Sequence, residues 1–139
     1  MTLQEIKTYI EGIAAKQPNI HTIVKTGDIY DLNTLGDVKY GAFCCTQQPH
    51  QEQNGWRTYR FYLFVVDRLL ADKSNKIEVQ SNAIEVLSNV VNTIKNNDEL
   101  ELTDVITYTT FTQRFASECA GAYCMVSIDM PISECMESY

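Results

Sequence analysis

The chain has 139 residues, of which 45% are hydrophobic and 21% are charged, a composition typical of a globular protein that buries its own core. Eleven basic and 18 acidic residues give a net charge of −7. This charge argues against tight nucleic-acid binding, because such binding requires cationic side chains that displace counterions. It is compatible with a passage along which DNA slides without being held.

The cysteine count and the N-terminus bear on the cellular compartment. Five cysteines is an odd number, and the first residues lack the basic and apolar regions of a secretory signal. We therefore expect reduced thiols and synthesis in a cytoplasm. No stretch reaches the roughly 18 apolar residues that a transmembrane helix needs, so no membrane association is expected.

The first predicted element is a helix over Leu3–Lys16. Thr2 and Glu5 have the spacing of a capping box, in which each side chain bonds the backbone N–H of the other residue. Pro18 limits the helix, because the residue before a proline avoids helical dihedral angles. The apolar stripe of this helix consists of Leu3, Ile6, Ile10 and Ile13.

Two short segments and a longer strand follow the helix. Ile20–Val24 is a β-branched run that favours a strand, and Asp31–Gly36 is predicted to be irregular. Val38–Thr46 is predicted to be a strand. One face of that strand is expected to carry Val38, Tyr40, Ala42 and Cys44. The polar stretch Gln47–Gly55 contains a proline and almost no apolar side chain, so it is predicted to be a loop or the tip of a projecting hairpin.

Arg57–Asp67 is the strongest predicted strand of the chain. Its apolar side chains alternate onto both faces, which places it near the centre of a sheet. A second helix is predicted over Val79–Lys95. The residues that recur there at helical spacing are Ala83, Ile84, Leu87, Val91 and Ile94.

Two further strands complete the pattern. Leu102–Phe111 is rich in β-branched and aromatic residues, and Ala120–Met130 alternates until Pro131 ends it. The inward row of the last strand is predicted to be Ala122, Cys124, Val126, Ile128 and Met130. This order of elements predicts an α+β fold, a mostly antiparallel β-sheet with two helices packed on one face. We expect a single domain over residues 1–139, from which the polar segment at about 47–55 projects.

The cysteines are interpreted as structural residues. Gaps of four and ten residues separate Cys119, Cys124 and Cys135, whereas structural zinc sites favour repeated close pairs. Cys44 and Cys45 are adjacent, so in a strand they point to opposite faces. Buried free cysteines behave as small hydrophobic residues, and we therefore expect no metal and no cofactor.

No catalytic residues are predicted. A cysteine or serine nucleophile needs a base, most often histidine, and the two histidines, His21 and His50, lie in no catalytic motif. The segment Thr112–Phe115 is read as a polar and basic connection between two strands, with Arg114 as its most interesting side chain.

Two other positions each allow two interpretations. Asp67 either pairs with Arg68 or Arg114, fixing a loop or a subunit contact, or simply meets water at the end of its strand. Trp56, the only tryptophan, either anchors a partner or packs on its own sheet.

The pattern as a whole resembles a known family. The phrases GDIYDLNTLGDVKYGAF, YRFYLFVVDRLL, SNAIEVLSNVVNTI and AYCMVSIDMP follow the N-terminal helix in this order. With the strand VITYTTFTQRFASECAG, this arrangement resembles the tail-terminator and head–tail connector proteins of tailed phages, of the kind found in the necks of crAss-like phages. The resemblance covers nearly the whole chain and consists of element order and local phrases.

The resemblance implies a tail-terminator-like fold and a non-enzymatic structural role. Such proteins form homo-oligomeric rings, six-fold or twelve-fold, between the portal and the tail of the virion, and DNA passes through them. The implied partners are other copies of the chain and other neck, portal-adaptor and tail proteins. The virion protein would be made in the host cytoplasm.

Candidate interface residues combine the polar segment with the residues whose readings are open. They are Gln47, Gln48, His50, Gln53, Trp56, Asp67, Arg68, Arg114 and Tyr139. Two other functions compete with the ring: a small cytoplasmic monomeric adaptor that uses the region of Trp56, and a thiol-dependent enzyme that uses Cys119 or Cys124.

Overall fold

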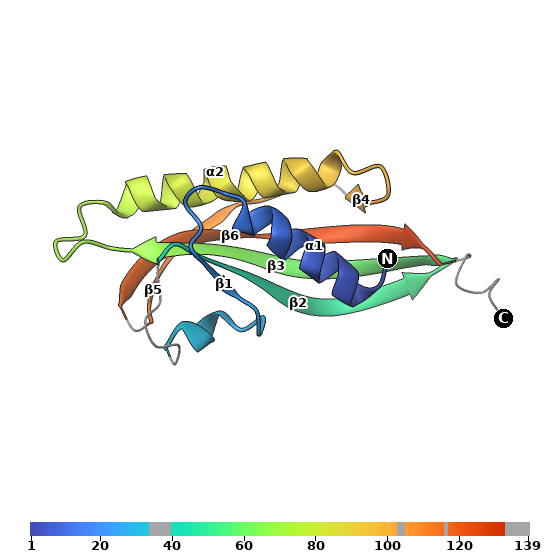
Figure 1. Cartoon of the computed structure of the whole chain (residues 1–139), viewed down its shortest axis with the longest axis horizontal. Helices are drawn as coiled ribbons and strands as arrows, with labels where there is room; N and C mark the ends of the chain where they lie inside the picture. Colours follow the sequence, from blue (N-terminus) through green and yellow to red (C-terminus); the bar gives the residue numbers. More distant parts are fainter. Residues whose placement is uncertain (34–39, 103–104, 116, 133–139) are drawn as a thin grey trace.

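A computed structural model of the chain describes residues 1–33, 40–102, 105–115 and 117–132. In these residues two α-helices and one short 3-10 helix accompany six strands (Figure 1). In chain order the elements are α1 (Leu3–Ala15), β1 (Thr22–Val24), η1 (Ile29–Asn33), β2 (Ala42–Gln53), β3 (Trp56–Arg68), α2 (Lys76–Lys95), β4 (Glu101–Leu102), β5 (Thr109–Arg114) and β6 (Glu118–Pro131).

The six strands form one mixed sheet, and the fold class is α+β. The main strand order is β1-β2-β3-β6-β4, and β5 also pairs with β6. β1 runs parallel to β2, and every other pair is antiparallel. β3 therefore lies between two long neighbours, as the apolar residues on both of its faces predict.

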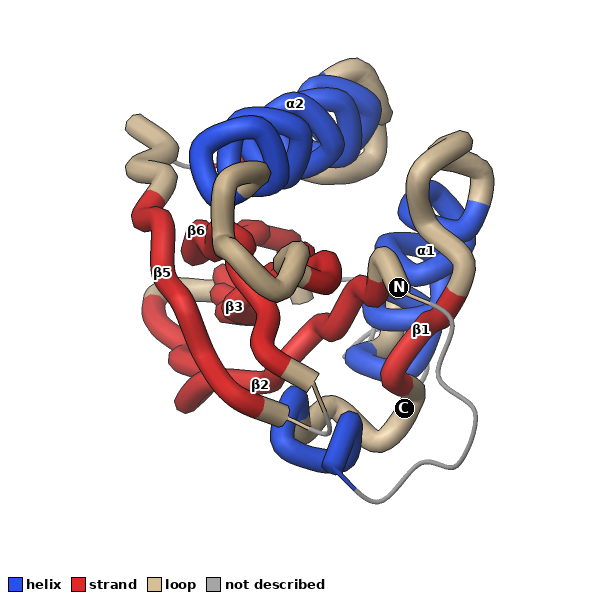
Figure 2. The backbone as a smooth tube through the Cα atoms, turned by 90° about the vertical axis from the view of Figure 1, so that its left-hand side faces the viewer, coloured by secondary structure: helices blue, strands red, loops and turns tan. Residues whose placement is uncertain are grey.

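Both helices pack on one face of the sheet. Ile6 and Ile10 of α1, Leu87 and Ile94 of α2, and Phe61 of β3 belong to a single buried cluster. The inward row predicted for the last strand is confirmed, because all five of its side chains are buried in this cluster. Figure 2 shows α2 on one side of the sheet and η1 on the other.

The helix boundaries follow their local signals. The capping box is confirmed: Thr2 Oγ1 accepts from the Glu5 N–H at 3.2 Å, and Glu5 Oε1 accepts from the Thr2 N–H at 3.1 Å. α2 begins at Lys76, one turn earlier than its apolar spacing predicts. The three residues of that extra turn are exposed and only one of them, Ile77, is apolar, so a search for apolar periodicity does not find it.

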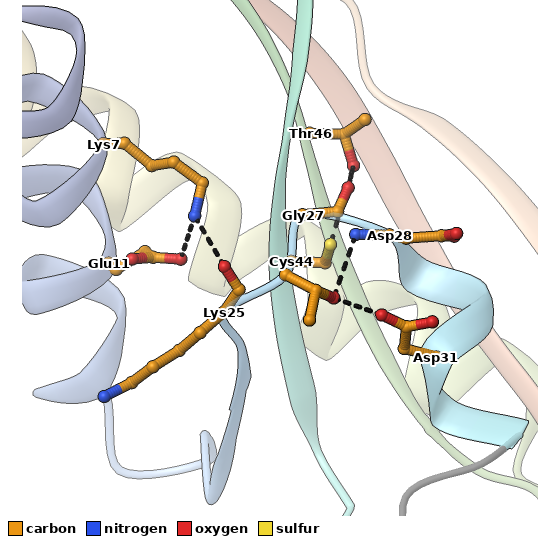
Figure 3. A network of polar contacts seen from close by, with 9 residues as sticks. Lys7, Glu11, Lys25, Gly27, Asp28, Asp31, Cys44 and Thr46 are labelled. Atoms are coloured by element: carbon orange, nitrogen blue, oxygen red, sulfur yellow. Dashed lines mark hydrogen bonds and ion pairs between the residues drawn. The ribbon is translucent and has the colours of Figure 1, made fainter.

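A smaller buried cluster lies on the opposite face, at one end of the sheet. It joins Ile29 and Leu32 of η1 to Val66 and Phe115. Polar contacts around the loop before η1 hold this end together (Figure 3). Thr46 Oγ1 donates to the Gly27 carbonyl at 2.8 Å, and the Thr26 hydroxyl donates to Asp31.

The same loop is tied to α1. Lys7 Nζ donates to Glu11 Oε2 at 2.8 Å and to the Lys25 carbonyl at 3.0 Å (Figure 3). Gly27 has φ of +81°, a backbone conformation that side chains other than glycine rarely adopt.

Of the two predictions for residues 47–55, a loop or the tip of a projecting hairpin, the structure shows the hairpin. β2 continues through the polar stretch to Gln53, and only Asn54 and Gly55 form the turn, with φ of 52° and 81°. Positive φ at both central residues is the signature of the type I′ hairpin turn, for which Asn-Gly is a preferred sequence. The ladder to β3 overrides the weak strand propensity of a glutamine-rich sequence.

Three other boundaries differ from the predictions. The strand predicted over Leu102–Phe111 is two strands: β4 ends at Leu102, β5 begins at Thr109, and residues 105–108 belong to neither. Residues 112–114 belong to β5 and are not a connection. β2 begins at Ala42, where its pairing with Val66 starts, and the predicted start at Val38 lies outside the described residues.

Candidate interaction surface

Within the described part of the chain, the sheet face opposite α1 and α2 is covered at one end only, and we call it the open face. Cross-strand pairing arranges its side chains in rows across β2, β3 and β6. From the covered end outward these rows are Cys44–Phe64–Tyr123, Thr46–Tyr62–Met125, Gln48–Arg60–Ser127, Gln51–Thr58–Asp129 and Gln53–Trp56–Pro131. The face thus changes from buried and apolar to exposed and polar, and it ends in a tryptophan.

Aromatic rings dominate the middle of the open face. The Tyr123 ring lies 5.4 Å from that of Phe64, 5.8 Å from that of Tyr62 and 6.0 Å from that of Phe111, measured between centroids. All four residues are only partly buried. Met125, beside Tyr62 in its row, has 45% of its surface exposed. A half-exposed aromatic and methionine patch is the composition that protein interfaces favour.

The distal end of the open face is polar and slightly hollowed. A depression of about 330 Å³ is lined by Gln51, Gln53, Asn54, Trp56, Thr58 and Asp129. The Thr58 hydroxyl donates to Asp129 Oδ1 at 2.5 Å, and Arg60 Nη2 donates to Gln51 Oε1 at 3.0 Å. Trp56 is 45% exposed at the rim, so its indole is available to a partner.

A β-bulge positions these side chains. The pairing passes from Gln48–Arg60 to Gln51–Thr58, so Pro49 and His50 together oppose Tyr59. A proline, which lacks an N–H, is tolerated at such a bulge. The extra residue turns His50 toward the helix side, where its ring lies 5.3 Å from that of Tyr59, and it turns Gln51 onto the open face.

Residues 47–60, the distal half of the β2–β3 hairpin, form what we call the arm. Its tip extends past both helices at the end of the sheet (Figure 1). On the helix side, Arg57 bridges the two strands of the arm, with Nη2 at 2.7 Å from Glu52 Oε1, and its Nη1 donates to the Tyr59 hydroxyl at 3.1 Å.

The arm brings together several of the predicted interface residues but divides them between two faces. Gln48, Gln53 and Trp56 lie on the open face. Gln47 pairs with Phe61 and His50 contacts the ring of Tyr59, so both lie on the helix side. The bulge and the alternation of the strand thus separate the candidate interface residues of this segment, and their role as an interface stays a prediction.

Asp67 and Arg68 lie far from the arm, at the opposite end of β3. Asp67 Oδ1 accepts from the backbone N–H of Arg68 at 2.7 Å, and the Arg68 guanidinium lies 5.0 Å from the centroid of the Tyr40 ring. Asp67 thus contacts the backbone of Arg68 at the end of its own strand. Tyr139 and the side chain of Arg114 lie outside the described residues.

The four described cysteines are buried and unpaired by disulfides. Cys44 and Cys45 belong to clusters on opposite faces, as predicted. Burial raises the pKa of Cys44 and of Cys119 to about 11 and that of Cys124 to about 12. Burial also raises the pKa of Cys45. Such thiols stay protonated at neutral pH, and a thiol is a weak nucleophile in that form.

A second hollow lies at the end of the sheet away from the arm tip. It has a volume of about 310 Å³ and is lined by Leu69, Lys73, Lys76, Thr112, Gln113, Glu118 and Cys119. Lys73 Nζ lies 3.4 Å from Glu118 Oε2. Opposite charges thus meet at its mouth, and the hollow carries no strong net charge.

The sequence reading missed the central residues of the open face. Tyr62, Met125 and Asp129 lie in predicted strands, but the sequence pattern singles out none of them as a surface residue. Their signal was present in the alternation of β3 and β6, where the partners of the inward rows are large and partly polar. What the alternation does not reveal is that, among the described residues, neither α1 nor α2 covers that side and η1 covers only one end of it.

Comparison with protein-family models and with curated proteins found no match for this chain. Within the described ranges, no three side chains of the His, Cys, Asp or Glu types are grouped so as to hold a metal ion. None of the described helices has the length and apolar character needed to cross a membrane.

Proposed function

We propose that the chain is a structural subunit of a homo-oligomeric ring in the neck of a tailed phage, between the portal and the tail. The ring would join head to tail and line the DNA passage. The observation that carries this proposal is the arm: a two-stranded projection with an exposed Trp56 at its tip. The resemblance of the element order to tail terminators and head–tail connectors supports the same role.

The arm suits the contact that a ring requires. A closed cyclic ring uses a heterologous interface, in which one surface of a subunit meets a different surface of its neighbour. A projection that reaches beyond the helices can contact a neighbouring subunit without disturbing its own core. Six-fold or twelve-fold closure then depends on the angle of that contact, and other neck, portal-adaptor and tail proteins would bind the two rims.

The charge of the chain fits a passage for DNA. A net charge of −7 repels phosphates when it lines a channel, so DNA would move through without specific binding.

The test of this proposal is ring formation by the purified chain, observed by electron microscopy and by native mass spectrometry. Closed rings of six or twelve copies are the expected result, together with labelling of the neck by an antibody against the chain on intact virions. A wild-type chain that stays monomeric, and an antibody that labels no virion, would overturn the proposal and favour the monomeric adaptor.

A shortened arm tests the arm contact separately. Removing Glu52, Gln53, Trp56 and Arg57 deletes two cross-strand pairs from the hairpin. Because hydrogen-bonded and non-hydrogen-bonded pairs alternate, the deletion of two pairs leaves the Asn-Gly turn beside the same type of pair. We expect this variant to fold but to lose its rings. Ile77→Ala changes a side chain that is 76% exposed on α2 and serves as the matched control, which should leave the rings intact.

A further inference from the structure

We infer that the open face is a pairing surface for a second copy of this chain, with the two sheets packed face to face and their strands antiparallel about a two-fold axis. This contact is isologous, whereas ring closure needs a heterologous one. The inference therefore goes beyond the proposed function and does not depend on it.

The row pattern supplies the register of the pair. On β3, the Trp56 row and the Tyr62 row lie six residues apart, about 20 Å along the strand. A two-fold axis that crosses β3 at Tyr59 exchanges these two rows. In this register the exposed indole of each copy lies against the Tyr62–Met125 row of the other.

The same axis aligns opposite charges. It places Arg60 of one copy over the Gln51–Thr58–Asp129 row of the other, within reach of the Asp129 carboxylate. Glu101 pairs with Asp129 in the β4–β6 ladder and adds negative charge at this position. The same two-fold rotation thus brings the apolar groups of the two copies together and places opposite charges near each other.

This self-complementarity is the reason to choose a second copy as the occupant. The indole and the aromatic–methionine patch are on one chain but too far apart to touch each other within it. Two sheets that pack face to face lie about 10 Å apart with their strands within about 30° of each other. Tryptophan, tyrosine, methionine and arginine are long enough to fill such a gap.

The predicted contact is small. Three strands across and the length from Trp56 to Tyr62 span roughly 14 Å by 23 Å, which places the pair at the small end of protein interfaces. We therefore expect a weak dimer, with a dissociation constant of about 10 to 100 μM, the range of transient contacts.

Charge reversal gives a decisive test. In the homodimer of Arg60→Asp, the carboxylate at position 60 of one copy would face the Asp129 carboxylate of the other. In the homodimer of Asp129→Arg, two guanidinium groups would face each other in the same way. Sedimentation velocity between about 5 and 500 μM, a range that brackets the expected constant, should show each variant at least tenfold weaker in self-association than wild type. An equimolar mixture should form a heterodimer, because both of its Arg–Asp contacts are attractive. The double variant Arg60→Asp/Asp129→Arg should recover the homodimer.

The controls separate pairing from folding. Asp129 also accepts the Thr58 hydroxyl, so each variant is checked by urea unfolding, and Thr58→Val reports the loss of that bond without a change of charge. Wild-type chains that stay monomeric across the range would overturn the inference. So would single reversals that leave association unchanged, or a mixture that pairs no better than its components. Because ring closure uses a different contact, rings that persist in all the variants would leave the proposed neck function standing whether or not the face-to-face pair fails.

Discussion

The imidazole Nδ1 of His50 accepts a hydrogen bond from the backbone N–H of Arg60 at 3.1 Å. A side chain thereby bonds a β3 amide at the bulge, where the regular β2–β3 ladder is interrupted. Nδ1 can accept only while it is unprotonated, so the neutral ring with its proton on Nε2 is the state that fits. Tyr59 and Phe61 pack against the ring.

The first prediction concerns pH. Burial lowers the pKa of His50 below its ordinary value of 6.5, so below pH 6.5 the unfolded chain binds more protons than the folded chain does. Linkage then requires that the His50 contribution to stability is present above pH 6.5 and is lost as pH falls. Urea unfolding at pH 8 and pH 5.5 should show this loss. The loss should disappear in His50→Gln but persist in His21→Gln, which changes an exposed histidine. If the free energy of unfolding fell equally between pH 8 and pH 5.5 in the two variants, His50 would not be the group responsible.

Local signals in the sequence predicted much of the fold. The Thr2–Glu5 capping box, the helical stripes and the alternation of the last strand each depend on residues a few positions apart, and each was confirmed. The polar stretch of β2 was harder, because its strand conformation depends on the β3 backbone and not on its own propensity.

The candidate surface was predictable only in part, because a bulge changes which face of the sheet each later residue of the strand occupies. Alternation counted outward from Cys44 places His50 on the open face and Gln51 on the helix side. The extra residue at Pro49–His50 reverses both assignments. Without the bulge and the register to β6, the sequence cannot show that Gln51, Thr58 and Asp129 form one row.

Gly121 allows two strands to approach closely, and its replacement should be costly. A Cβ at position 121 would lie 2.0 Å from the Val65 carbonyl oxygen, so the backbone of β3 or β6 would have to move. We expect Gly121→Ala to lower the free energy of unfolding by roughly 3 kcal/mol. Gly12→Ala is the matched control, because nothing lies within 4 Å of a Cβ added at position 12, which is an exposed helix position. That change should stabilise the chain by about 0.5 to 1 kcal/mol. A neutral Gly121→Ala would contradict the close approach.

The buried thiols should be inert in the folded protein. In the variant Cys135→Ser, only the four buried cysteines remain, and burial raises the pKa of each. Ellman's reagent at pH 8 should therefore label no thiol until urea unfolds the chain, and then it should label all four. Rapid labelling of Cys119 or Cys124 in the native state would instead favour the thiol-dependent enzyme.

Trp56 provides an intrinsic probe of the open face, since it is the only tryptophan in the chain and is 45% exposed. In dilute solution its emission should be that of a hydrated indole and iodide should quench it. As the protein is concentrated, the indole should move against the Tyr62–Met125 row of a second copy, so the emission should shift to the blue and quenching should fall. Met125→Glu places a charge in that row and should hold the dilute spectrum at every concentration. Ile77→Glu also replaces an exposed apolar side chain by a carboxylate, at position 77 of α2, and it should behave as wild type. A blue shift that survives Met125→Glu would mean that the indole is covered by another surface. The ring contact of the arm would then be the first alternative, because Trp56 lies at the tip of the arm.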